Sequence, residues 1–150
     1  MSTNSFKGLR VAVVTLIVFL AFQFELGMAI NLSDPPNIPP ISFSLHNVLG
    51  ALNQVGSIAL VHALLGTVLT VLALVTLVLA LASKIRSVQV FGVLGFLSMT
   101  LAATSGVLFV LSGYQNDHYS HGMATNFILT FVFYFLELYF LKPSPKTQQS

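Results

Sequence analysis

Four long apolar stretches constrain the fold of this chain more than any other feature of its sequence. They run from about Leu9 to Ile30, Ile58 to Ala82, Val88 to Ser112 and Tyr119 to Leu141. A helix that crosses the core of a bilayer needs about 20 apolar residues, and each stretch reaches that length. Strands are shorter, and lipid admits only helices or closed barrels. The sequence therefore predicts an all-α integral membrane protein in which residues 1–150 form one four-helix transmembrane bundle.

The composition excludes several other classes of protein. Apolar residues make up 55% of the chain and charged residues only 7%, against about 25% charged in an ordinary soluble domain. This excludes a soluble globular enzyme, and the hydrophobicity excludes disorder. The absence of cysteine excludes disulfides, thiolate metal sites and covalent c-type heme. The few basic residues are dispersed, so we predict no nucleic-acid partner. The composition leaves a homo-oligomer open.

The basic residues predict the orientation of the spans. They precede the first stretch, lie in the turn between the second and third, or follow the fourth; they are Lys7, Arg10, Lys84, Arg86, Lys142 and Lys146. The positive-inside rule therefore places both termini and the 83–87 turn in the cytoplasm. We expect the membrane to be the plasma membrane of the cell. The segments 31–57 and 113–118 are then external. The first stretch could be a signal peptide, but its length and its Gly-Met-Ala-Ile end favour a retained helix.

The external segment 31–57 has an organisation of its own. Asp34–Pro40 is rich in proline, which favours an extended chain. Apolar residues then recur at helical spacing, at Leu45, Val48, Leu49, Leu52 and Val55. This pattern predicts a short amphipathic helix over about 44–55 on the outer membrane surface, capped by Ser42 or Ser44 and broken near Gly56. The alternative is an irregular loop that covers the bundle.

The histidines suggest a site near the external face. None of the four, His46, His62, His118 and His121, falls on the cytoplasmic side. Because a helix rises about 1.5 Å per residue, His62 and His121 can reach the same depth in facing spans. Two imidazoles facing each other in a four-helix bundle can hold a b-type heme. Gly66 and Thr125, four residues after each histidine, would leave room for the porphyrin, and His118 is the reserve ligand.

A simpler interpretation exists for each of these residues. Histidines at helix ends are often solvated, which fits His118 and His46 best. Glu25, near the external end of its span, could reach the interface, carry a proton or pair with a buried cation. Glu137 is expected to extend to the inner interface, where Lys142 or Lys84 would neutralise it. The small residues of the third stretch, from Gly92 to Gly106, are expected to form a helix-packing surface.

The two histidine-bearing stretches carry a resemblance to a known family. His62-Ala-Leu-Leu-Gly-Thr-Val-Leu resembles the second helix of the heme A synthase family, and His121-Gly-Met-Ala-Thr-Asn-Phe-Ile-Leu resembles its fourth helix. The chain looks like one four-helix unit of the compact archaeal type. The resemblance implies conversion of heme O to heme A, with heme bound by His62 and His121. Ala59 and Ala63 stand where the family has a Glu and an Arg.

Three functions are therefore weighed. The first is a b-type heme-binding membrane protein resembling heme A synthase. The second is a non-catalytic membrane subunit of a respiratory or terminal oxidase complex, which would pack through its small-residue span. The third is a small proton-coupled transporter with Glu25 as the coupling carboxylate.

Overall fold

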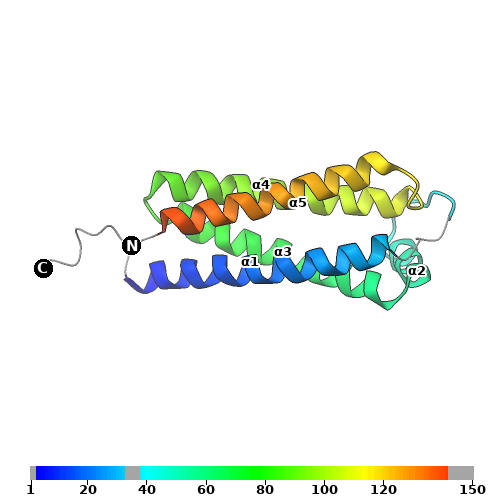
Figure 1. Ribbon diagram of the computed structural model, residues 1–150, viewed down its shortest axis with the longest axis horizontal. Coiled ribbons are helices and arrows are strands. Elements are labelled where there is room, and N and C mark those ends of the chain that lie inside the picture. Colours follow the sequence, from blue (N-terminus) through cyan, green and yellow to red (C-terminus); the bar gives the residue numbers. More distant parts are fainter. Residues whose placement is uncertain (1–2, 33–37, 142–150) are drawn as a thin grey trace, which may run out of the picture.

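The described part of the chain folds into five helices, four of which form a bundle. The computed structural model describes residues 3–32 and 38–141. The helices are α1 (Thr3–Asn31), α2 (Leu45–Val55), α3 (Ser57–Leu81), α4 (Arg86–Leu111) and α5 (Asp117–Phe140). Figure 1 shows the four long helices side by side, with α2 at one end. We call the end that carries α2 the α2 end. The opposite end, where α1 begins and α5 ends, is called the inner end.

The four predicted long helices are present. Each of the four long helices is long and apolar enough to cross a membrane. The α1 helix begins at Thr3, earlier than the apolar stretch that predicted it. Large apolar side chains are exposed along the outside of the bundle, for example Val11, Leu64 and Val68 at 65%, 67% and 61%. Such a surface suits a lipid environment, because a soluble protein rarely exposes so much contiguous apolar area.

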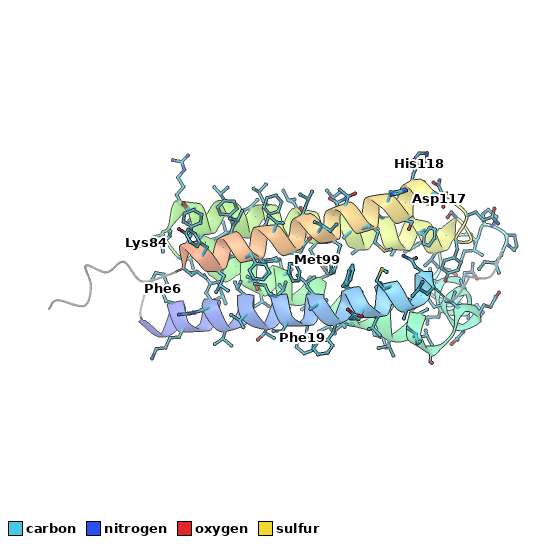
Figure 2. All side chains as sticks on the ribbon, viewed as in Figure 1. Phe6, Phe19, Lys84, Met99, Asp117 and His118 are labelled. Atoms are coloured by element: carbon cyan, nitrogen blue, oxygen red, sulfur yellow. The ribbon has the colours of Figure 1, made fainter. Side chains whose placement is uncertain are left out.

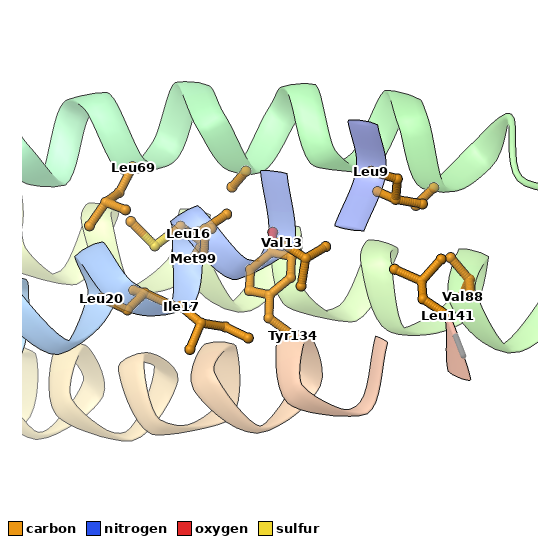
Figure 3. Close-up of a cluster of buried hydrophobic side chains, with 12 residues drawn as sticks. Leu9, Val13, Leu16, Ile17, Leu20, Leu69, Val88, Met99, Tyr134 and Leu141 are labelled. Atoms are coloured by element: carbon orange, nitrogen blue, oxygen red, sulfur yellow. The ribbon is translucent and has the colours of Figure 1, made fainter. Parts of the chain in front are cut away.

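Each long helix packs against two neighbours in the bundle. The most extensive contact is between α4 and α5; α1 contacts α3 and α5, and α3 contacts α1 and α4. The α3 and α5 helices therefore lie diagonally opposite each other. Figure 3 shows the main core, where side chains from all four helices meet. Its fully buried apolar members are Leu9, Val13, Leu16, Leu20, Leu69, Ala73, Ala80, Val88 and Tyr134.

The short helix predicted in the segment 31–57 is confirmed as α2. Its N-terminus is capped by Ser44, whose Oγ accepts a hydrogen bond of 3.1 Å from the backbone N–H of Asn47. It ends at Gly56, where a φ of 120° favours glycine. Its residues Val48, Ala51, Leu52 and Val55 pack in a second core that includes Ile38 and Val110, whereas Leu45 and Leu49 are exposed. The irregular-loop alternative is therefore wrong for these residues. Most of the proline-rich segment, like Lys142 and Lys146, lies outside the described residues.

The turn after α4 completes this second core. Gly113 has a φ of 70°, and a Cβ at this position would collide with the carbonyl oxygen of Ile38. Tyr114 also has a positive φ, of 64°, and its ring packs edge-on against Phe109 with centroids 5.5 Å apart. The Tyr114 hydroxyl is buried without a hydrogen-bond partner. This burial raises the pKa of Tyr114 to about 12.

We therefore expect the α2 end to lose stability at high pH. The unfolded tyrosine ionises near its ordinary pKa of about 10, whereas folded Tyr114 keeps its proton until about 12. Stability contributed by neutral Tyr114 is thus lost as the pH rises between these values. A tyrosinate absorbance titration should show a component near 12, and Tyr114→Phe should remove it. An unchanged titration in that variant would contradict the burial of this hydroxyl.

Candidate functional site

The side chain of Glu137 lies inside the bundle, one turn before the end of α5. Its exposed fraction is 0%. Neither carboxyl oxygen has a hydrogen-bond partner among the described residues. Gly92 of α4 lies opposite, so that a Cβ added there would be 3.6 Å from Glu137 Oε1. The carboxyl group is thus at van der Waals distance from this position, and the Cβ of Ala80 on α3, at 2.7 Å, is the atom that a side chain at Gly92 would displace.

This burial corrects the prediction that Glu137 reaches the inner interface. Lys84, one of its two expected partners, is exposed, and Lys142 lies outside the described residues. The physical reason is the rotation of α5 about its own axis. The helix turns position 137 toward α4, and not toward the water beyond the helix end.

Tyr134 lies one turn before Glu137 on the same face of α5. Its side chain is also 0% exposed, and its hydroxyl has no hydrogen-bond partner. A Cβ added at Gly95 would come within 2.9 Å of Tyr134 Cζ, the carbon that bears the hydroxyl. Figure 3 shows the ring extending from α5 into the core. Gly92 and Gly95, which lie about one turn apart on α4, thus face two polar side chains that lie about one turn apart on α5.

The α4–α5 contact continues along both helices. Gly106 faces Met123, and Gly122 faces Ser105. The buried face of α4 is made mainly of small residues: Gly92, Gly95, Ser98 and Ala102. The prediction that this stretch is a packing surface is confirmed. Because the contact is internal, this face is occupied by α5 and is not free for a partner subunit.

A second polar pair joins α1 to α3 nearer the α2 end. The Nε2 atom of Gln23 lies 3.1 Å from His62 Nε2 and donates a hydrogen bond of 3.0 Å to the backbone carbonyl of His62. Each side chain lies over a glycine of the other helix. A Cβ at Gly27 would be 3.2 Å from His62 Cε1, and one at Gly66 would be 3.2 Å from Gln23 Nε2. Gln23 and His62 therefore interlock two antiparallel helices.

The described conformation does not bring the two predicted heme ligands together. The ring of His62 faces α1, and the space beside Gly66 holds the amide of Gln23. His121 and Thr125 on α5 are exposed, and α5 is diagonal to α3. The residues in this arrangement do not fit a bis-histidine heme, because only one of the two imidazoles faces the interior. The heme site therefore stays a prediction.

The remaining predicted site residues lie on the surface. His118 is exposed and projects away from the bundle at the α2 end (Figure 2). His46 on α2 is exposed, and so is Glu25 on α1. Among the described residues, no group of three or more His, Cys, Asp or Glu could hold a metal ion. The structure thus singles out Glu137, which the sequence placed at an interface, and not Glu25.

Comparisons of the chain with known protein families, with curated proteins and with solved structures found no match. The resemblance to heme A synthase therefore rests on the two histidine-bearing stretches alone.

One signal in the sequence could have indicated the Glu137 site. Asn126, Thr130, Tyr134 and Glu137 recur at intervals of four, four and three residues, which places polar side chains along one face of an apolar helix. Thr130, Tyr134 and Glu137 are all buried. A polar stripe on a membrane helix indicates the face that turns away from lipid.

The interlocked pair predicts that Gly66→Val destabilises the bundle. Its Cβ would lie 3.2 Å from Gln23 Nε2, so the added methyl groups would displace the amide and break its hydrogen bonds. Overpacking of this kind costs about 1–3 kcal/mol. Thermal unfolding in detergent should show the loss.

Gly8→Val is the matched control, since a Cβ at Gly8 meets nothing within 4 Å. Both variants gain the same helix propensity, so equal melting temperatures would contradict the contact between Gln23 and Gly66.

Proposed function

We propose that the protein is a proton-coupled membrane protein in which Glu137 binds and releases a proton inside the bundle. The observation that supports this is a fully buried carboxyl group whose two oxygens have no hydrogen-bond partner among residues 3–32 and 38–141. An ionised carboxylate without hydrogen bonds or a counter-ion is very costly to bury, so the bundle holds the neutral acid. Ionisable groups inside membrane helices are rare and mark proton or ion pathways.

The two ends of the bundle differ in their basic residues and in what covers them. This difference indicates from which end Glu137 exchanges its proton. Glu137 lies near the inner end, where the exposed residues Lys7, Arg10, Lys84 and Arg86 also lie. The positive-inside rule assigns this end to the cytoplasm. The α2 end is covered by the second core, which contains Ala51, Leu52 and Ile38. The proposal is therefore that Glu137 exchanges its proton with the cytoplasm.

Among the three functions weighed from the sequence, this arrangement favours the small proton-coupled transporter, with Glu137 in the place first given to Glu25. In this proposal Glu137 binds the coupling proton and does not bind the transported substrate. Transporter substrates bind near the midplane of the bilayer, whereas Glu137 lies within one turn of the end of α5.

Infrared spectroscopy of the reconstituted protein tests the proposal. We expect a carbonyl stretch of a protonated carboxylic acid at neutral pH, because the buried group is neutral. Glu137→Gln should remove this band while the bundle stays folded, since glutamine has the same shape and no charge.

Glu25→Gln is the control, because Glu25 is exposed and its replacement should leave the band intact. A wild-type spectrum with ionised carboxylates only, or a band that persists in Glu137→Gln, would contradict the proposal.

Heme binding is the second candidate. One observation favours it: the Nδ1 atom of His62 is buried and has no hydrogen-bond partner among the described residues. The exposure of His121 does not add support. This candidate concerns the opposite part of the bundle from Glu137, so the two proposals are tested separately.

The visible spectrum of protein purified from heme-replete cells tests this candidate. Heme bound by His62 predicts a Soret band that is lost in His62→Ala. His46→Ala should retain the band, because His46 is exposed on α2. A colourless preparation would count against heme binding and would leave the Glu137 proposal unaffected.

A further inference from the structure

Release of the proton from Glu137 leaves a negative charge that the bundle must accommodate. The groups around the carboxyl offer few hydrogen-bond donors. On α4 the facing residues are Gly92 and Gly95, which have no side chains. On α3, Ala80 packs against Gly92, and the hydroxyl of the buried Thr76 already donates to the backbone carbonyl of Leu72 at 2.8 Å.

The other elements at the inner end supply no buried charge. The α1 residues in the core there, Leu9 and Val13, are apolar. The basic residues of the described chain at this end, Lys7, Arg10, Lys84 and Arg86, are all exposed. On α5 itself the buried titratable neighbour is Tyr134, whereas Tyr139 is exposed. Within the described residues, the hydroxyl of Tyr134 is therefore the buried donor near Glu137 that has no partner of its own.

The geometry allows the two side chains to meet. Residues three positions apart lie on the same face of a helix, and their positions are separated by about 4.5 Å along its axis. Gly92 and Gly95 have the same spacing on α4, and each lies opposite one of the two side chains. It is the hydroxyl-bearing carbon of the ring, Cζ, that lies nearest Gly95. In the described conformation both polar groups are unpaired.

We propose that Tyr134 is the positioning residue of the proton site: its hydroxyl donates a hydrogen bond to the Glu137 carboxylate when the proton leaves. The proton passes to water at the inner end, and the hydroxyl keeps its own proton. Gly95 is needed because a Cβ there would displace the ring. This inference rests on the proposed function of Glu137.

The pH dependence of carbodiimide labelling tests this role. A hydrophobic carbodiimide, dicyclohexylcarbodiimide, modifies protonated carboxyl groups within membranes, and mass spectrometry locates the modified residue. In wild-type protein in lipid vesicles, labelling of Glu137 should fall as the pH rises through a midpoint. Tyr134→Phe removes the donor, so Glu137 keeps its proton to higher pH. A hydrogen bond to a charged group predicts a midpoint higher by about one to two pH units.

Two further variants separate this role from a general effect on folding. Tyr119→Phe removes a hydroxyl from the opposite end of the same helix, and its midpoint should equal that of the wild type. Gly95→Ala keeps the hydroxyl but pushes the ring, since the new Cβ would lie 2.9 Å from Cζ. Its midpoint should move in the same direction as that of Tyr134→Phe and by less.

The outcomes distinguish the inference from the function on which it rests. Labelling of Glu137 with the same midpoint in wild type, Tyr134→Phe and Gly95→Ala would overturn the role of Tyr134 and leave the proton site intact. Absence of Glu137 labelling in wild type at every pH would overturn the proton site itself. Should Tyr134→Phe fail to fold by circular dichroism, an unshifted midpoint in Gly95→Ala would by itself overturn the inference.

Discussion

The close approach of α4 to α5 over Gly92 and Gly95 is the contact on which the candidate site depends. Helices in lipid gain little from burying apolar side chains against each other, so small residues that permit close backbone packing dominate their contacts. Here the same small residues lie against two polar side chains. The ring of Tyr134 occupies space that a Cβ at Gly95 would fill, and the carboxyl group of Glu137 lies in van der Waals contact with the Gly92 position. The packing of the bundle and the chemistry of its site therefore have one structural origin.

Much of the fold could be predicted from sequence because its determinants are local. The length of each apolar stretch predicts a spanning helix, and the spacing of Leu45, Val48 and Leu52 predicts α2. Ser44 and Gly56 mark the limits of α2 through hydrogen bonding and backbone conformation, both properties of single residues. The boundaries were less predictable: α1 continues to Thr3 because the polar residues before its apolar run do not prevent helix formation.

The candidate site could not be predicted in the same way, because it depends on how each helix is rotated about its axis. Spacing along a helix gives the depth of a residue but not the direction of its side chain, and a helix that is apolar on all sides gives little indication of its inward face. His62 and His121 illustrate this limit. Their expected depths agree, yet His62 faces Gln23 on α1 while His121 is exposed. Glu137 shows the converse, since its position near a helix end suggested contact with water.

Two pairs of polar side chains lie against glycines in this bundle, Gln23 with His62 and Tyr134 with Glu137. The first pair is explained by a structural role, and the second is not. The amide of Gln23 donates to the backbone of His62, so that pair forms a hydrogen-bonded link between α1 and α3. Tyr134 and Glu137 are more deeply buried, yet neither group has a hydrogen-bond partner within the part of the chain that the structure describes. Burial of polar groups that form no hydrogen bonds carries a desolvation cost. Hydrophobic residues of similar volume would pack at these two positions without that cost. A buried acid beside an unpaired hydroxyl is therefore poorly explained by stability alone, and it is the arrangement expected where a carboxyl group must alternate between its neutral and charged forms.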